Sequence, residues 1–477
     1  MEQIWLKRKN SLLFVPLMFF FVSCIDGYKD DWSFSSGVEN ATLDSPEAIT
    51  FTKNAEGNIL TITWSVVYGA IAYEFSLYDV TDPNNAIPII NKELVDGCSK
   101  QCNIEEDSNY KIEVRTIGNP KLNNKDALTA TEETYSTMIP AITIPNGTDL
   151  FAFFTENGII ELVGEEGEEL EVAYELEAGG TYTLTGEVDF DTHWLTLRGN
   201  KANRPKLIYD AEGRIATRAG LKIKFIDFDC SAMPAGTNNA SFLLLSSSGS
   251  GSIARPIVIQ SCNIKGLNRN FIYDNGRSYS PQYLLIQDCI IAFNSAERFI
   301  RFTDTSYANN LTLSNSTFYG LVNSTAYWIQ YRNNARGTNT SVNITNCTFY
   351  NIANSGQMAN YSGLNASSCL LTLRRNLFVG CGNKDVVRRL SAGSTSIQRD
   401  LLYNCYWYDA DGDGEADFGP SEEMGHGQGD KSGTGFYENP FFTGNISDPD
   451  PDNVDFTPGA GAVGILLNRC GDPRWLP

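Results

Sequence analysis

The stretch IVIQSCNIKG at residues 257–266 alternates apolar and polar residues and places a small residue, Cys262, before a second short apolar run. The same pattern returns as LLIQDCIIAF (284–293), LTLSNSTFYG (311–320), VNITNCTFYN (342–351) and LTLRRNLFVG (371–380). No copy has helical spacing, and the copies recur about every 28 residues. A repeat of this length, with one alternating strand in each copy, predicts the coils of a parallel β-helix.

The aligned copies contain a column of small or polar residues, namely Cys262, Cys289, Ser316, Cys347 and Asn376. Stacking of coils would turn this column into an interior ladder where space is limited. Cysteine is a small residue that is often buried, so these thiols need no chemical role. A zinc site would need close cysteine pairs, which the column does not have.

Two further segments resemble known proteins. The stretch LEAGGTYTLTGEVDFDTHWLTLRG (176–199) resembles the first coils of pectin-lyase-like right-handed β-helices. The motifs DFTP (455–458) and GDPRW (471–475) resemble the C-terminal part of uncharacterised surface lipoproteins of Bacteroidetes. That resemblance implies a fibronectin-III-like domain joined to a β-helix, and a setting in polysaccharide uptake. We therefore expect a right-handed parallel β-helix with a C-terminal cap over residues 141–477.

Residues 41–140 also have a β pattern. Short alternating strands are expected at NILTITWSVV (58–67), AYEFSLYDV (72–80) and NYKIEVRTI (109–117). Trp64 and Tyr110 resemble the core aromatic and the corner tyrosine of a fibronectin-III-like sandwich. The whole chain is thus predicted to be all-β, with this sandwich before the β-helix.

The N-terminus has the layout of a secretory signal. Three basic residues precede an apolar run and then Cys24, as in a bacterial lipoprotein signal peptide over residues 1–23. Cys24 would be lipidated, and residues 24–40 would form a tether. The following Lys29-Asp30-Asp31 resembles a signal for export to the outer face of the outer membrane. Cys98 and Cys102 are close enough in sequence that they could form a disulfide and close a small loop in an oxidising compartment.

A second set of strands suggests a ligand-binding strip. These strands are NFIYD (270–274), RFIRF (298–302), YWIQYR (327–332) and VVRRL (386–390). If Ile272, Ile300, Ile329 and Val387 point inward, alternation turns their neighbours outward. The predicted strip then consists of Phe271, Tyr273, Phe299, Arg301, Trp328, Gln330, Arg332 and Arg388. Aromatic faces beside arginines suit an acidic glycan, although loops that cover the rings as part of the fold are the alternative.

Catalytic residues cannot be assigned from the sequence. The motifs of pectate-lyase-like active sites are absent, and the chain contains only two histidines, His193 and His426. Carboxylates that a hydrolase would need are available, but none forms a marked pair. An enzyme acting on an acidic glycan, as a polysaccharide lyase or glycoside hydrolase, therefore remains an alternative without named residues.

The loop DADGDGEADFG (409–419) resembles the start of many calcium loops. Asp409, Asp411, Asp413 and Asp417 are spaced so that alternate carboxylates converge on a hard cation. An EF-hand would have glutamate at the twelfth position, where this chain has Pro420. We expect structural calcium here, with a solvated acidic turn as the alternative.

The balance of charge excludes one class of partner. The chain has 57 acidic and 36 basic residues, a formal net charge of −21, so it has no general attraction for nucleic acid. The leading hypothesis is a cell-surface glycan-binding lipoprotein of a polysaccharide utilisation system, anchored in the outer membrane and facing the exterior. Its partners would be extracellular polysaccharide and an outer-membrane glycan transporter. A structural or adhesive surface protein is a further alternative.

Overall fold

A computed structural model describes residues 38–477 except 55–57, 165–166, 168, 236–240, 332–338, 361–365, 392–395, 410 and 418–428. The signal peptide, Cys24, most of the tether and Arg332 lie outside the described residues. The chain divides into two compact units, one built mainly from residues before 136 and one from residues 136–477 together with 79–86 and 105–109. No described helix is long and apolar enough to cross a membrane.

The first unit consists of two sheets, with strand orders β1-β2-β5 and β4-β3-β6-β7. Its elements are β1 (Ile49–Lys53), β2 (Ile59–Trp64), β3 (Ala70–Asp79), β4 (Ile87–Val95), β5 (Ser99–Asn103), β6 (Asn109–Gly118), η1 (Pro120–Leu122) and β7 (Thr131–Ser136). The pairs β1-β2 and β2-β5 are antiparallel. Trp64 is buried and stacks on Phe75 with ring centroids 5.8 Å apart, and Tyr110 belongs to the same core.

Cys98 and Cys102 are free thiols in this unit. Cys102 lies on β5 and Cys98 comes directly before that strand. Four residues of extended chain span about 13 Å, which is beyond the reach of a disulfide. The strand geometry therefore explains why these two thiols are not bridged.

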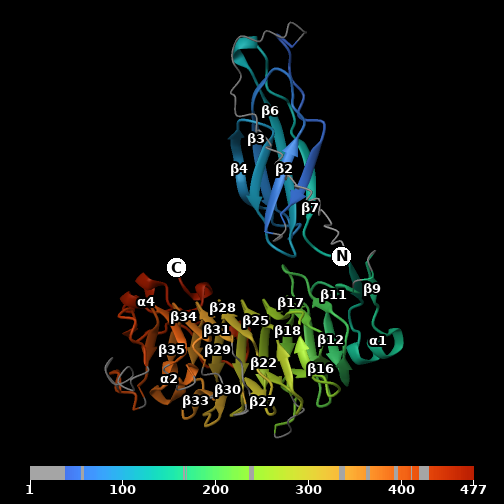
Figure 1. Ribbon diagram of the computed structural model, residues 1–477. Coiled ribbons are helices and arrows are strands. Elements are labelled where there is room, and N and C mark those ends of the chain that lie inside the picture. The colour runs from blue at the N-terminus through green and yellow to red at the C-terminus, as the bar shows by residue number, and fades with distance from the viewer. Residues whose placement is uncertain are drawn as a thin grey trace, which may run out of the picture. The chain divides into compact units, whose positions relative to one another are not determined.

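The second unit is a parallel β-solenoid of the right-handed type, as predicted. Three sheets form its faces (Figure 1). The first sheet consists of β8 (Ala141–Ile144), β11 (Val172–Leu176), β14 (Leu195–Arg198), β17 (Leu221–Lys224), β21 (Ile257–Gln260), β25 (Tyr283–Gln287), β28 (Asn310–Ser314), β31 (Ser341–Thr345), β34 (Leu370–Arg374) and β36 (Gln398–Leu402). The second consists of β12 (Thr181–Leu184), β15 (Lys206–Tyr209), β18 (Asp227–Asp229), β22 (Asn263–Leu267), β26 (Ile290–Phe293), β29 (Thr317–Gly320), β32 (Thr348–Tyr350), β35 (Leu377–Val379), β37 (Cys405–Trp407) and β38 (Phe436–Tyr437).

The third sheet is shorter and is followed by a helix. It consists of β13 (Glu187–Asp189), β16 (Arg214–Thr217), β19 (Leu243–Leu245), β23 (Ile272–Tyr273), β27 (Ile300–Phe302), β30 (Tyr327–Tyr331) and β33 (Gln357–Asn360). The remaining elements are α1 (Leu150–Asn157), β9 (Leu162–Val163), β10 (Glu169–Leu170), β20 (Gly251–Ile253), β24 (Tyr279–Pro281), η2 (Gly382–Lys384), α2 (Val386–Leu390), η3 (Pro451–Asn453), α4 (Val463–Asn468) and η4 (Pro473–Trp475). The strand predicted at 386–390 is therefore wrong, because this segment forms α2.

The column of small residues forms an interior ladder at the corner between the first and second sheets. All five predicted members are buried, and the three cysteines among them are free thiols. The Asn376 side chain accepts from the Cys347 N–H and donates to the Ile344 carbonyl. Asn404 extends the ladder by one coil, where its buried side chain accepts from the Asn376 N–H. The residue before each column position has positive φ, for example 47° at Asn315 and 52° at Asn346. A left-handed residue thus turns each coil at this corner.

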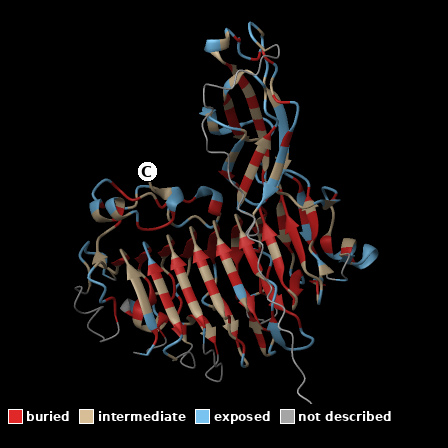
Figure 2. Cartoon of the chain, turned by 45° about the horizontal axis from the view of Figure 1, so that its top comes forward, coloured by how far each residue is buried: buried red, intermediate tan, exposed pale blue. Residues whose placement is uncertain are grey.

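Figure 2 shows buried residues alternating with partly exposed ones along the strands of the solenoid. This alternation is expected where one face of a sheet lines the core. The interior also contains stacked aromatic rings, among them Phe318, Phe349 and Phe378, with successive centroids 5.1 and 4.9 Å apart. The core therefore has the ladder arrangement that the repeat period predicts.

The C-terminal segment runs back over the outer face of the second sheet. The Asn263 side chain donates to Asp452, and the Lys265 ammonium lies 3.1 Å from Asp450. Asp472 is buried further along this face and accepts a hydrogen bond of 2.8 Å from the Thr317 hydroxyl. These polar contacts fix the segment across several coils.

The pH dependence of stability should report on this C-terminal segment. Burial raises the pKa of Asp472 to about 6, against an ordinary value of 3.8, while Arg474 opposes the rise. The folded protein then binds this proton more tightly than the unfolded chain does, so the contribution of Asp472 to stability increases as pH falls through about 6. Lowering the pH from about 7.5 to about 5 should therefore raise the Tm of the wild type relative to that of Asp472→Asn. A Tm difference that does not change with pH would contradict this role.

Candidate functional site

The predicted aromatic strip is not on the surface. Phe271 and Phe299 are fully buried and Trp328 is only 3% exposed, so the prediction that these rings face outward is wrong. They stack on one another in the core, with centroids 4.7 Å apart between Phe271 and Phe299 and 4.5 Å apart between Phe299 and Trp328. The physical reason is the corner before the third sheet, where consecutive residues such as Phe271 and Ile272 both point inward.

Three other predicted residues do lie in one row of the third sheet. Tyr273 pairs with Arg301, and Arg301 pairs with Gln330. The Arg301 guanidinium lies 5.7 Å from the centroid of the Tyr273 ring, and Tyr273 is only 8% exposed. The arginine therefore covers the ring, and the row does not offer an open aromatic face to a sugar.

A polar groove of about 680 Å³ lies beside this row, where the coils enter the third sheet. We define the groove by the residues that line it: Ala296, Glu297, Arg298, Thr325, Ala326, Tyr327, Ser355, Gly356, Gln357, Gly382, Asn383, Asp385 and Arg389. They come from the successive coils that contain β27, β30, β33 and α2, which Figure 1 shows side by side. Tyr327 pairs with Gln357, so these two side chains share one row across the groove.

An arginine cluster surrounds Glu297 at one end of the groove. The Glu297 carboxylate binds Arg269, lies 2.9 Å from the Arg298 guanidinium and lies 3.9 Å from that of Arg301. Burial, and then the charges of Arg301 and Arg269, lower the pKa of Arg298, while Glu297 opposes the change. An arginine remains charged under such a shift. Three positive charges therefore share one carboxylate here.

A second arginine cluster surrounds Asp385 at the other end. The Arg388 guanidinium lies 2.6 Å from the Asp385 carboxylate, and that of Arg389 lies 3.0 Å from the same oxygen. Asp385 precedes α2, so the helix presents both arginines to it. The predicted residue Arg388 thus reaches the site from a helix and not from a strand. Two positive charges share one carboxylate.

The groove combines guanidinium groups with carboxylates that are already paired. Both of its carboxylates already accept hydrogen bonds from arginines. His193 lies outside the groove, where its ring nitrogens contact the Phe190 carbonyl and Glu161. Guanidinium groups match the planar geometry of a carboxylate and also bind sulfate and phosphate oxygens. The site therefore suits recognition of an acidic group.

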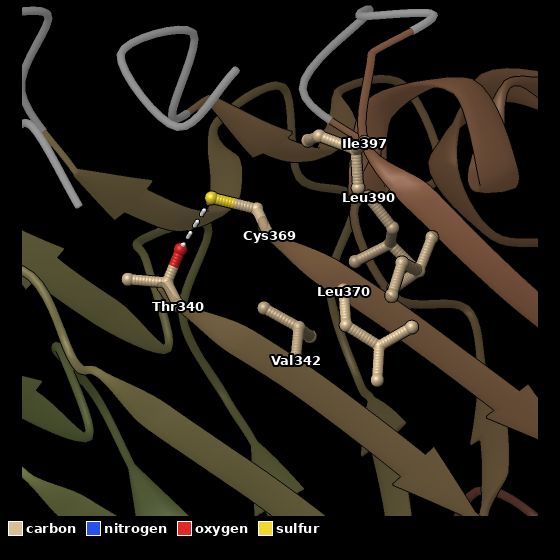
Figure 3. Close-up of a pocket in the computed structure, with 7 residues that line it drawn as sticks. Thr340, Val342, Cys369, Leu370, Leu390 and Ile397 are labelled. Carbon is tan, nitrogen blue, oxygen red and sulfur yellow. Dashed lines mark hydrogen bonds between the residues drawn. The ribbon is translucent and has the colours of Figure 1, made fainter. Parts of the chain in front are cut away.

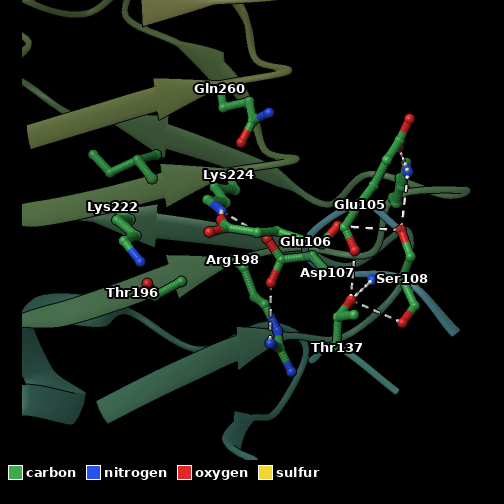
Figure 4. Close-up of polar contacts among 12 residues, drawn as sticks. Glu105, Glu106, Asp107, Ser108, Thr137, Thr196, Arg198, Lys222, Lys224 and Gln260 are labelled. Atoms are coloured by element: carbon green, nitrogen blue, oxygen red, sulfur yellow. Dashed lines mark hydrogen bonds and ion pairs between the residues drawn. The ribbon is translucent and has the colours of Figure 1, made fainter. Parts of the chain in front are cut away.

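Two other regions are less suitable as binding sites for an acidic ligand. A cavity of about 10 Å³, lined by Thr340, Cys369 and apolar side chains, has room for no more than a water molecule (Figure 3). Lys224 is buried on the first sheet, but it contacts Glu106 at 2.8 Å and Asp107 at 2.7 Å, which belong to the same unit (Figure 4). Its charge is more than compensated by these two carboxylates, so this cluster gives no excess positive charge for an acidic ligand.

The aspartate loop lies between β37 and β38, at the C-terminal end of the second sheet. Ligand atoms of Asp409, Asp411 and Asp413 lie within 4.8 Å of one another, which is compatible with binding to one cation. Asp417 does not belong to this group, although its backbone N–H donates to the Tyr408 carbonyl at 2.9 Å. The geometry therefore accommodates three of the four predicted ligands.

The sequence pattern pointed to Arg301 and Arg388 but not to the residues that complete the two clusters. Those residues are Arg269, Glu297, Arg298, Asp385 and Arg389. A usable signal was present, since each cluster has a carboxylate directly before or close to two arginines, as in Glu297-Arg298 and in Asp385 with Arg388-Arg389. A carboxylate followed within four residues by two arginines is therefore the pattern to look for.

Two parts of the chain match protein families that have no assigned function. Residues 2–179 match a domain of unknown function (DUF4992), and residues 180–321 match a second one (DUF4957). No curated protein matches the chain. Among solved structures, a mutant of the PL6-family alginate lyase AlyGC is similar at 11% identity, with a TM-score of 0.32 over 61% of this chain and 42% of that one. Pectate lyase PelI from Erwinia chrysanthemi, in complex with tetragalacturonic acid, is similar at 11% identity, with a TM-score of 0.15 over 69% and 85% of the two chains. The match therefore spans less than half of the alginate lyase.

Proposed function

We propose that this protein binds an acidic polysaccharide in the groove of the solenoid. The observation that carries the proposal is the number of arginines at the two carboxylates of the groove, three around Glu297 and two around Asp385, in a chain whose formal net charge is −21. Arg298 and Arg389 line the groove itself, and the other three arginines contact its carboxylates without lining it. A local concentration of guanidinium groups against that background attracts acidic ligands to one place. Tyr327, which is partly exposed in the groove, offers a ring on which a sugar can pack.

Binding is favoured over catalysis by the state of the carboxylates. A hydrolase needs one carboxylic acid free to donate a proton and a second carboxylate free to act on water or the sugar. Glu297 and Asp385 are both held by arginines. A lyase of acidic glycans is the second candidate, because arginines that bind the carboxylate of a uronate also help to acidify the neighbouring proton. An absorbance change from unsaturated uronates would identify that activity.

The setting of the proposed function is the cell surface. The signal-like N-terminus with Cys24 supports a lipoprotein of the outer membrane that faces outward. The first unit supports a fibronectin-III-like spacer, because the seven strands among its described residues form two sheets around Trp64. A polysaccharide utilisation system, with an outer-membrane transporter as partner, would then receive the bound glycan.

A glycan array of the lipid-free protein tests this proposal. We expect retention on acidic polysaccharides, such as polyuronates or sulfated glycans, and no retention on their neutral counterparts. Binding should weaken as salt is raised, because the arginines interact with the ligand through charge. Retention on no glycan, or equal retention on neutral glycans, would contradict the proposed function.

Calcium is proposed as a structural ion of the loop formed by Asp409, Asp411 and Asp413. Three carboxylates this close repel one another unless a cation neutralises them. None of the three aspartates lines the groove. We expect calcium titration to give a measurable heat that Asp411→Asn removes. Chelation should lower the Tm slightly and leave glycan binding unchanged. Loss of glycan binding on chelation, with no change in Tm, would place the ion in the binding site.

A further inference from the structure

We propose that the groove contains two separate subsites for anions and therefore selects an acidic chain that is long enough to place one acidic group in each subsite. The inference rests on the proposed function and specifies its ligand. The first subsite consists of Arg298 and its neighbours around Glu297, and the second of Arg388 and Arg389 around Asp385. Arg298 and Arg389 both line the groove.

The distribution of charge along the groove separates the two subsites. The lining residues from the two intervening coils are all uncharged: Thr325, Ala326, Tyr327, Ser355, Gly356 and Gln357. Two of them, Ala326 and Gly356, are small. A Cβ atom added to Gly356 would lie 2.2 Å from the Ala326 carbonyl oxygen, so only glycine fits there. The middle of the groove is thus lined by uncharged residues, two of which have small side chains or none.

The coil geometry sets the distance between the subsites. Ile300 pairs with Ile329, which places Arg298 opposite Tyr327, and Tyr327 pairs with Gln357. The helix α2 follows as the next layer and packs against β33. Adjacent layers of a sheet are about 4.8 Å apart, so the three steps from Arg298 to α2 amount to about 14 Å along the solenoid axis.

The subsite around Glu297 has unused capacity for an anion. The Arg298 Nε atom is buried and has no hydrogen-bond partner among the described residues. Around Glu297, three guanidinium groups face one carboxylate, which offers about four lone-pair positions. A ligand with acidic groups about 14 Å apart would meet both subsites at once, and the second contact would then be intramolecular.

A series of oligouronates of increasing length tests the inference by isothermal titration calorimetry. For the wild type, we expect weak binding of the short members and a rise in affinity of at least about tenfold once the chain spans both subsites. Arg389→Gln should remove that rise and leave the affinity for the short members within about twofold of the wild type. Arg374→Gln is the matched control, because Arg374 is paired with Asp400 at 2.6 Å on the first sheet, away from the groove-lining residues.

The outcomes separate the inference from the proposed function. Affinity that rises smoothly with length, or a step that Arg389→Gln preserves, would overturn the two-subsite inference while acidic glycan binding stands. Binding of no member of the series, nor of sulfated chains, would overturn both. A thermal melt of Arg389→Gln that matches the wild type excludes misfolding as the cause of a lost step.

Discussion

Replacing Trp328 by alanine should lower the free energy of unfolding of the solenoid by about 3–5 kcal/mol, the range for large aromatic to alanine changes in a core. The ring stacks on Phe299 at 4.5 Å and meets Phe318 and Phe349 edge to face at 5.4 and 5.3 Å. Removing it leaves a cavity between coils, and each coil depends on its neighbours for burial. Denaturant-induced unfolding, followed by the tryptophan-independent far-UV circular dichroism signal, measures the loss.

Tyr327→Ala is the matched control, since Tyr327 precedes Trp328 on the same strand but is partly exposed in the groove. We expect this change to affect stability far less than Trp328→Ala and to weaken glycan binding. The opposite pattern, with Trp328→Ala stable but unable to bind glycan, would mean that the ring faces the ligand after all.

Replacing Arg298 by alanine should reduce the affinity for acidic glycan by at least about tenfold, which corresponds to about 1.4 kcal/mol. Arg298 lines the groove and is one of three guanidinium groups that share Glu297. Its loss removes a charged donor and lets Glu297 repel the ligand more strongly. Titration of a polyuronate into the wild type and the variant under the same salt conditions measures the change.

Arg374→Ala controls for a general loss of positive charge, because it removes an arginine that is also paired with a carboxylate but lies on the first sheet. Its affinity should equal that of the wild type. If both variants lose affinity to the same extent, binding depends on overall charge and not on the groove.

The repeat allowed most of the solenoid to be predicted. The column from Cys262 to Asn376 is buried as expected, because a fixed period forces equivalent residues into one ladder. The third sheet was harder to predict. Its strands are short and begin at a corner, so the alternation that was used to turn Phe271, Phe299 and Trp328 outward does not hold there.

The site was predictable only in part, for a related reason. Arg301 and Arg388 were identified from local patterns. Their counter-ions Glu297 and Asp385 were not identified. Glu297 also pairs with Arg269 of the preceding coil, and Asp385 meets its arginines because residues 386–390 form a helix and not the predicted strand. The register between successive coils decides which charges meet, and coils of 27 to 31 residues do not fix that register at their corners.

A crystal structure of the protein with a bound acidic oligosaccharide would show directly whether the groove is the glycan-binding site. We expect the sugar chain in the groove, with one acidic group at the Arg298 cluster and the chain passing Tyr327 and Gln357. A chain bound on the outer face of the first sheet, or on the first unit, with the groove empty, would contradict the central claim.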